Sequence, residues 1–548
     1  MTADGLRAFY QNRFRVVVAG VIALLTVLAW INRFIQDDAF ISFRYAENLV
    51  NGHGLVWNPG ERVEGYTNFL WTLLMAIPIA LGYDPVPFSL GLGMACFAVT
   101  LGLTYLLASS ILGSKNLGIL TILLLGTNYT FSAYATGGLE TQMQACLFVA
   151  CACVVTRAVR SRIWTIGKSL SLSLLCAAAL LIRLDSSILV IVLLGASSYS
   201  ILSENASVRT KQFLMLSLAA PLVIIVGGWL LWKLAFYGSI LPNTFYSKVS
   251  GAASIERGFY YFYVFLKTYW LIPMPFLAIW VLWKMQAPWK HPAAILAAIV
   301  ALWFLYMIRV GGDFMEFRFV VPVMPFFFIL LVMMIAELTT SRPVQALLVV
   351  VIIMGSLWHA MTYTGYVSVK YRGIESIEEL NNHVTSKGQN WSHVGRLLGE
   401  AFHYRPDVVI ATTAAGAIPY YSRLATVDML GLSDSRIARE GVVVGDVPGH
   451  TKIARFSYLR ERKVNLLIGP PWFRGVDESL DQPYTLNSTR NFTIMTEHDR
   501  IPYDSMLIEI PVDPKWVLTV LYLTRHPFID DVIRQQGWKV WPVTQLSR

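Results

Sequence analysis

The sequence predicts a multi-span α-helical membrane protein with a soluble α/β domain at its C-terminal end. Of its 548 residues, 55% are apolar and only 14% are charged, and the mean hydropathy is +0.53, far from the composition of soluble globular chains. Apolar runs of membrane length stop near residue 366, and charged residues become dense beyond it. We therefore expect a membrane domain over residues 1–366 and a soluble domain over residues 367–548.

About eleven segments of the first domain are apolar enough to cross a bilayer, which takes about 20 residues in a helix. We expect spans at residues 14–35, 86–111, 117–134, 141–159, 168–183, 185–203, 212–236, 264–284, 291–309, 319–337 and 343–366. The run at 68–81 is shorter, and we place it as a juxtamembrane helix inside the first outer loop, 36–85. The first span lacks the small-residue cleavage site of a signal peptide, so we expect a retained anchor.

Lys and Arg predict the orientation of these spans, because they are enriched in cytoplasmic loops. With the N-terminus in the cytoplasm, the inner segments hold 13 Lys and Arg against three acidic residues. An odd number of spans then places the C-terminal domain outside the membrane. That domain holds 21 basic and 20 acidic residues, and this near-neutral charge argues against a nucleic-acid partner and leaves the lipid bilayer as the expected environment.

Polar residues of the membrane domain gather at its outer rim. Two adjacent acids, Asp37 and Asp38, directly follow the first span, where an uncompensated charge is costly and is usually functional. Further candidates on the same side come from the rest of the first outer loop and from the four loops that follow. They are Arg44 and Glu64 in the first outer loop, Glu140 in the second, Arg183 and Asp185 in the third, Asn243, Tyr246 and Lys248 in the fourth, and Asp313 and Arg318 in the fifth. We expect these five loops to surround one cavity.

These charges predict a particular chemistry. A carboxylate that takes a proton from an acceptor hydroxyl, beside cations that stabilise a phosphate leaving group, is what glycosyl transfer from a lipid phosphate requires. The chain has no Gly-rich phosphate loop, HExxH motif or Cys–His metal spacing. No cofactor is therefore predicted, and although the carboxylates leave a divalent metal open, their spacing defines no metal site.

Structural roles are open for the same residues. Long basic side chains near span ends commonly reach out to lipid headgroups, and an acid at the start of a helix stabilises its dipole. The alternatives are ion pairs of Asp37 or Asp38 with Arg33 or Arg44, headgroup contacts of Lys248 and Arg318, a structural pair of Arg183 with Asp185, and a dipole role for Glu140.

The residues that start at the acid pair resemble a known family. The string from Asp37 to Glu64, DDAFISFRYAENLVNGHGLVWNPGERVE, is similar to the first outer loop of the terminal β-(1→2)-arabinofuranosyltransferases of mycobacterial cell walls and their wider bacterial relatives, within the GT-C membrane glycosyltransferases. Shorter similarities lie at residues 138–141, 241–244 with Lys248, 312–313 with Arg318, 418–420, 427–428, 431–432 and 448–450.

The resemblance implies a bacterial plasma-membrane enzyme of the GT-C type whose active site faces outward. Its donor would be decaprenyl-phosphate arabinofuranose, its acceptor a hydroxyl of a cell-envelope glycan, and its catalytic acid Asp37 or Asp38. The triplet Arg183-Leu184-Asp185 departs from the Arg-Pro-Glu of many relatives. Another polyprenyl-phosphate sugar, such as mannose or aminoarabinose, a protein acceptor and either stereochemical outcome stay open.

The soluble domain has the pattern of mixed α and β structure. Short apolar strands are expected at residues 407–412, 464–468, 492–495 and 506–510, between polar helical stretches. We expect this domain to bind the acceptor. The candidate acceptor contacts are Asp428 and His450, with Glu64 of the first outer loop; a folding cap without a ligand is the alternative.

Two other classes of protein make different predictions. A transporter of lipid-linked sugars would place charges at the bilayer midplane and would show an internal repeat. The sequence has its charges at one rim and no such repeat. A non-catalytic scaffold would keep sugar transfer intact when both Asp37 and Asp38 are replaced.

Overall fold

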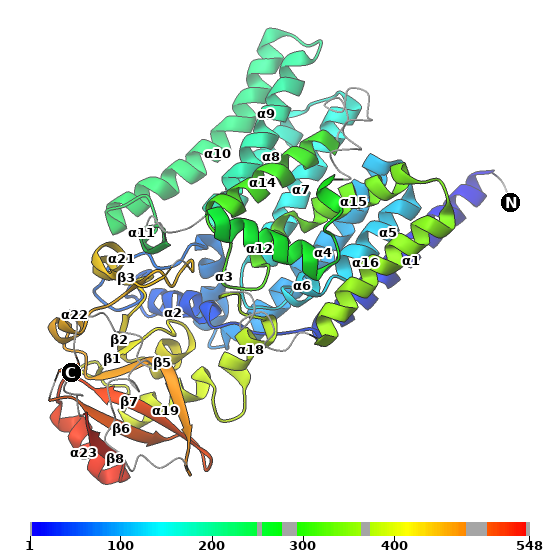
Figure 1. Ribbon diagram of the computed structural model, residues 1–548. Helices are drawn as coiled ribbons and strands as arrows, with labels where there is room; N and C mark the ends of the chain where they lie inside the picture. The colour runs from blue at the N-terminus through cyan, green and yellow to red at the C-terminus, as the bar shows by residue number, and fades with distance from the viewer. Residues whose placement is uncertain are drawn as a thin grey trace.

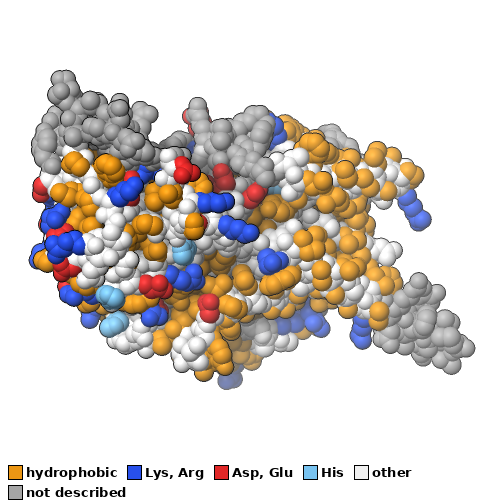
Figure 2. All heavy atoms as spheres, turned by 90° about the horizontal axis from the view of Figure 1, so that it is seen from below, with side chains coloured by type: hydrophobic (Ala, Val, Ile, Leu, Met, Phe, Trp, Pro, Cys, Tyr) orange, Lys and Arg blue, Asp and Glu red, His pale blue; other side chains and the backbone are white. Residues whose placement is uncertain are grey.

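The computed structural model describes residues 3–248, 255–276, 293–362, 373–445, 447–477, 501–502 and 504–543. The chain forms a helical part, up to residue 362, and a C-terminal part, from residue 373, which is built around a β-sheet (Figure 1). Apolar side chains cover much of the visible helical surface, whereas charged side chains gather on the C-terminal part (Figure 2). The first surface suits lipid and the second suits water.

Seven helices among the described residues are long and apolar enough to cross a membrane. They are α1 (Ala3–Ile31), α4 (Pro85–Leu112), α7 (Thr141–Ser161), α9 (Ser187–Ser203) with the short η1 (Leu184–Ser186), α10 (Val208–Tyr237), α15 (Met324–Leu338) with η3 (Arg318–Val323), and α16 (Arg342–Thr362). Shorter apolar helices are α3 (Phe69–Ala80), α5 (Lys115–Gly126), α8 (Ile166–Ile182) and α14 (Ala293–Arg309). The multi-span helical fold is confirmed, while the number of eleven spans stays a prediction.

Two expected spans differ from the helices observed. The segment 117–134 is broken, because Asn128 caps a new helix, α6 (Tyr129–Ala133), by accepting a hydrogen bond from the Phe131 N–H at 3.0 Å. At 264–284, helix α12 (Ile255–Thr268) ends early. The end of that segment lies outside the described residues.

The first outer loop is mostly structured. Helix α2 (Asp38–Val50) begins it and α3 ends it, and the 12 residues of α3 are too few to span a bilayer. Ala39 to Ala46 of α2 are all buried, because α2 is covered by α3 on one side and by the C-terminal part on another. A helix is therefore present at 69–80, and its juxtamembrane position stays a prediction.

The C-terminal part contains a six-stranded sheet in the order β2-β1-β5-β7-β6-β8. Strand β1 is parallel to both of its neighbours, and the later pairs are antiparallel. The strands are β1 (Val409–Thr412), β2 (Ala425–Asp428), β5 (Leu466–Gly475), β6 (Met506–Pro511), β7 (Trp516–Tyr522) and β8 (Lys539–Pro542). Three predicted strands correspond to β1, β5 and β6, whereas the one at 492–495 lies outside the described residues.

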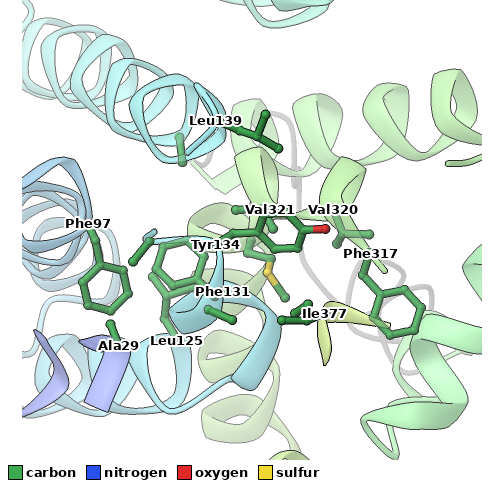
Figure 3. Packing of buried hydrophobic residues seen from close by; sticks show 14 of the residues in the cluster. Ala29, Phe97, Leu125, Phe131, Tyr134, Leu139, Phe317, Val320, Val321 and Ile377 are labelled. Carbon is green, nitrogen blue, oxygen red and sulfur yellow. The ribbon is translucent and has the colours of Figure 1, made fainter. Parts of the chain in front are cut away.

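Helices α19 (Trp391–Ala401), α20 (Ala417–Ser422) and α23 (Pro527–Gln536) accompany this sheet. A further helix, α18 (Ile377–Thr385), joins it to the helical part. Ile377 lies in the same apolar cluster as Tyr134 and Phe317 (Figure 3). Its N–H also donates to the Glu316 carboxylate at 2.9 Å. The core of the helical part thus continues into the C-terminal part.

Candidate functional site

A cleft of about 60 Å³ lies where the start of α2 meets the C-terminal part. The helical part contributes Gln36, Asp37, Asp38 and Phe314 to its lining. Among the residues that the C-terminal part contributes are Glu375, His383, Trp391, Thr413, Leu432 and His450. The structure therefore brings the acid pair to a cavity that both parts of the chain enclose.

Asp37 is bound into the C-terminal part. Its Oδ1 accepts a hydrogen bond from the Ala417 N–H at 2.7 Å, and its Oδ2 accepts one from the Gly416 N–H at 3.0 Å. A Cβ at Gly416 would overlap the Asp37 backbone and would lie 2.8 Å from its Cγ, so only glycine allows this approach. Burial, together with the charge of Asp38, raises the pKa of Asp37 to about 7 against the opposing effect of the two N–H donors.

Asp38 has a different environment from its neighbour. It is the first residue of α2, it is only partly buried, and its N–H donates to Gln36 Oε1 at 2.7 Å. Its carboxylate lines the cleft and lies within electrostatic range of Arg318. Of the two acids, Asp38 is the more accessible to a ligand.

A second, smaller hollow of about 10 Å³ is lined by four of the nine residues predicted to bind the donor. Two basic and two acidic side chains of the predicted set line it: Arg183, Arg318, Glu140 and Asp185. Arg183 pairs with Glu140 at 2.9 Å and with Asp185 at 2.6 Å. The loop of Glu140 is held against α2, since a Cβ at Gly138 would lie 2.7 Å from that of Ala39. Arg183 is thus fully engaged by carboxylates.

Arg318 is less engaged than Arg183. Its Nε donates to Asp313 Oδ2 at 2.8 Å, and neither Nη atom has a hydrogen-bond partner among the described residues. The residue before it, Phe317, has a left-handed backbone with φ of +44°, which is unusual for a bulky side chain. The loop from Asp313 to Arg318 therefore brings to this hollow a guanidinium whose Nη groups have no hydrogen-bond partner among the described residues.

Arg44 lies outside the lining of both hollows, and its role at the donor phosphate stays a prediction. Its guanidinium donates to the carbonyl oxygens of Trp57 at 2.7 Å, Leu424 at 2.9 Å and Pro419, and to Asn58 Oδ1 at 3.0 Å. Because these contacts come from both parts of the chain, Arg44 fastens α2 to the C-terminal part. Four of its five N–H groups are thus engaged within the protein.

The fourth loop is also placed away from both hollows, so the five loops do not surround one cavity. Asn243 donates to the carbonyl oxygen of Leu432 at 3.1 Å, and the ring of Tyr246 lies 4.6 Å from the guanidinium of Arg439. Both residues contact the C-terminal part instead of a donor site. The side chain of Lys248 lies outside the described part of the chain, and its role stays a prediction.

Two of the predicted acceptor contacts lie outside the cleft as well. Glu64 pairs with Lys233 at 2.8 Å, and Asp428 accepts a hydrogen bond from the Ser433 N–H at 2.6 Å. Burial raises the pKa of each carboxyl to about 7, and Lys233 opposes this for Glu64. His450 does line the cleft, with its ring 4.9 Å from that of Phe314.

Sequence reasoning missed three residues of the cleft, Glu375, His383 and Trp391. The His383 ring stacks on Trp391 with 4.3 Å between ring centroids and 14° between planes. Its Nε2 lies 3.3 Å from a carboxylate oxygen of Glu375. The signal available was a His and a Trp eight residues apart near the start of the soluble domain, which by itself is weak. Among the described residues no group of three or more His, Cys, Asp and Glu could hold a metal ion.

Comparisons with known proteins agree with this architecture. A family model described as a domain of unknown function (DUF8728) matches residues 379–530. The chain is 27% identical over 352 residues to a terminal β-(1→2)-arabinofuranosyltransferase of Mycobacterium tuberculosis, covering 55% of this chain and 52% of that protein. A protein of the same name from Corynebacterium glutamicum is 27% identical over 392 residues, with 63% and 54% covered.

The chain spans about half the length of the curated relatives it matches. A crystal structure of ArnT from Cupriavidus metallidurans bound to undecaprenyl phosphate is similar over 93% of this chain and 98% of that one, with a TM-score of 0.55 and 12% identity. At that identity the likeness shows the fold alone. The chain is thus a sequence relative of the terminal β-(1→2)-arabinofuranosyltransferases that has the GT-C fold of ArnT.

Proposed function

We propose that the protein is a glycosyltransferase that moves a sugar from a polyprenyl-phosphate donor to a hydroxyl of a cell-envelope glycan. The observation that carries this proposal is the position of Asp38, which lines the cleft and also lies within electrostatic range of Arg318. A base and a cation are needed on opposite sides of the sugar in such a transfer. The reaction takes place on the outer face of a bacterial plasma membrane, with the N-terminus in the cytoplasm.

In this mechanism Asp38 is the base. Its carboxylate takes the proton of the acceptor hydroxyl, whose oxygen then forms the new bond to the anomeric carbon of the donor sugar. The bond from that carbon to the phosphate oxygen breaks, and the electron pair stays on the phosphate. The free Nη groups of Arg318 donate to the phosphate oxygens as this charge develops.

Asp37 acts as a positioning residue in the same mechanism. Both of its carboxylate oxygens accept backbone N–H groups, so they are turned toward Gly416 and Ala417. Through these bonds Asp37 fixes the start of α2, and with it Asp38, against the C-terminal wall of the cleft. The roles proposed for the two acids therefore differ.

The names of the relatives support D-arabinofuranose as the sugar, because both are arabinofuranosyltransferases. The ArnT structure supports a lipid phosphate, since it contains undecaprenyl phosphate. Other sugars on the same carrier, such as mannose or aminoarabinose, and a protein acceptor are the alternatives to test beside them. Asp38 would have the same proposed role with another sugar or with a protein acceptor.

The test is transfer of radiolabel by the purified full-length protein. Decaprenyl-phosphate arabinose or polyprenyl-phosphate mannose is supplied with an arabinan oligosaccharide, and the product is separated from the donor. We expect Asp38→Asn to lower the rate by roughly 10²–10⁴-fold and Asp37→Asn to lower it less. Asp531→Asn, at an exposed carboxylate on α23, is the matched control. Full transfer by Asp38→Asn would exclude Asp38 as the base.

A further inference from the structure

We infer that Trp391, His383 and Glu375 form the subsite that binds the acceptor, and that this subsite takes the terminal sugar of an uncharged glycan. The inference rests on the proposed function and deepens it, because it assigns the two hollows to the two substrates. The cleft would receive the acceptor and the hollow at Arg318 the phosphate. Asp38 lines the cleft and lies within electrostatic range of Arg318, which lines the hollow.

The position of the cleft in the sheet is the first argument. Strand β1 pairs with β2, the next strand in the sequence, along one of its edges. The chain then crosses back, and β5 pairs with the opposite edge of β1. Open α/β sheets bind ligands at the carboxyl end of a strand where the order reverses in this way. Thr413, directly after β1, and Leu432, shortly after β2, both line the cleft.

The charge of the lining is the second argument. Among the described residues that line the cleft there is no Lys or Arg, whereas Asp37, Asp38 and Glu375 are acidic. A phosphate would be repelled there, but a neutral polyol would find acceptors and donors for its hydroxyl groups. The hollow at Arg318 has the guanidinium that the cleft lacks.

The third argument is the combination of an aromatic face with planar polar groups. Trp391 and His383 both line the cleft as a stacked pair, in which the imidazole covers one face of the indole. His383 and Glu375 keep about a third of their side chains exposed, 34% and 33%, so both can reach a ligand. Such a surface packs against the C–H face of a sugar while its edge bonds the hydroxyl groups.

His383 is suited to donate a hydrogen bond to a hydroxyl oxygen. Burial opposes its charged form, but the hydrogen bond and charge of Glu375, with the charges of Asp37 and Glu379, hold the pKa of His383 above its usual value. The imidazolium has a donor on each nitrogen. One nitrogen is used by Glu375 and the other is left for a ligand or solvent.

The wall is rigidly connected to the loop that carries Arg318. The N–H of Glu375 donates to the carbonyl of Phe314 at 2.6 Å, and its carbonyl accepts from the N–H of Glu316 at 3.0 Å. Ser376 and Glu379 then form a capping box at the start of α18. The three wall residues are thus fixed relative to Asp38, which a base needs if it is to meet one particular hydroxyl.

The size of the cleft limits how much of an acceptor enters. A volume of about 60 Å³ has room for roughly four water molecules at about 15 Å³ each. The reacting hydroxyl and the ring atoms beside it fit such a space, while the remainder of a chain stays outside. The subsite therefore recognises an end of a glycan.

The experiment measures acceptor and donor separately in the full-length protein. We expect Trp391→Ala and His383→Gln each to raise the KM for an arabinofuranosyl oligosaccharide about tenfold, while the KM for decaprenyl-phosphate arabinose stays within about twofold. Trp391→Phe should recover most of the loss. Trp541→Ala, on the far edge strand β8, and His403→Gln, an exposed residue beyond α19, are the matched controls.

A second readout separates this inference from the proposed function. Saturation-transfer NMR detects the same oligosaccharide on Asp38→Asn protein without any turnover, and Trp391→Ala in that background should abolish the signal. If Trp391→Ala abolishes the NMR signal but the protein transfers no sugar from either donor, the acceptor subsite is supported and the proposed reaction is refuted. An unchanged acceptor KM and an unchanged signal in both wall variants would overturn the subsite.

Discussion

The carboxylate of Asp37 and the backbone N–H of Ala417 are hydrogen-bonded at 2.7 Å, although 380 residues separate them in the chain. The bond joins the mouth of the first membrane helix to the loop after strand β1. Because α2 starts one residue later, the same contact fixes the direction in which Asp38 leaves the helix. A membrane helix and a mixed sheet thus together fix the position of the proposed base.

Gly416→Ala tests this junction from the side of the sheet. The added methyl group would overlap the backbone of Asp37, so the junction must open. We expect a stability loss of about 1–3 kcal/mol and a lower transfer rate. Gly445→Ala is the control, because the nearest atom to its Cβ, the carbonyl oxygen of His450, is 3.8 Å away. Equal thermal midpoints for the two variants would show that the junction tolerates a side chain.

The pH dependence of stability reports on Asp37 directly. Its pKa rises from 3.8 to about 7 on folding, so between these values the folded protein holds a proton that the unfolded chain releases. Its contribution to stability therefore declines as the pH rises through that window, by at most about 1.4 kcal/mol per pH unit. Asp37→Asn removes this contribution.

The measurement compares thermal midpoints at about pH 4.5 and about pH 7.5. The advantage of wild type over Asp37→Asn should be larger at the lower pH. The two proteins must be compared because Glu64 and Asp428 also have pKa values raised to about 7. These two groups change the pH dependence of the thermal midpoint equally in both proteins. A difference that grows toward high pH would mean that the N–H donors outweigh burial.

Much of the helical part could be predicted, because apolar runs such as Pro85–Leu112 and Val208–Tyr237 are local features of the sequence. The break at Asn128 was missed because the run from residue 117 to 134 has the length of a span, although Thr127, Asn128 and Thr130 interrupt its apolar character and Asn128 caps a new helix there. The acid pair was predicted because it, like the apolar runs, is a local feature of the sequence. Two adjacent carboxylates beside a span stand out without any knowledge of the fold.

The cleft wall could not be predicted, because long-range contacts create it. Glu375 meets the loop of Phe314 through backbone bonds, and backbone bonds leave no pattern in the sequence. Arg44 shows the same difficulty. Its place in the polar string after the acid pair suggested a phosphate contact, but its carbonyl partners at residues 419 and 424 lie in or just after α20, far along the chain.

Arg318→Lys tests the proposed cation at the donor phosphate. Lysine keeps the charge but lacks the planar fork through which Arg318 bonds Asp313 with Nε and keeps its two Nη groups for a second, bidentate partner. Losing a charge-assisted hydrogen bond costs about 1.5–3 kcal/mol, so kcat/KM for the donor should fall roughly 10- to 100-fold, with the acceptor KM unchanged. Arg309→Lys, at an exposed arginine that ends α14, is the control. An unaltered donor kcat/KM would place the phosphate elsewhere.

The buried pair of Lys233 and Glu64 offers a test of how the first outer loop is held. The two charges are 2.8 Å apart, with 1% and 4% of their side chains exposed. Lys233→Met leaves the Glu64 carboxylate without its cation, and we expect a loss of about 3–5 kcal/mol, seen as a lower thermal midpoint in detergent. Adding Glu64→Gln removes the stranded charge and should recover most of that loss. Lys211→Met, at an exposed hydrogen bond near the other end of α10, should have little effect. If the double variant is no more stable than Lys233→Met, the pair acts through packing, and its charges do not hold the loop.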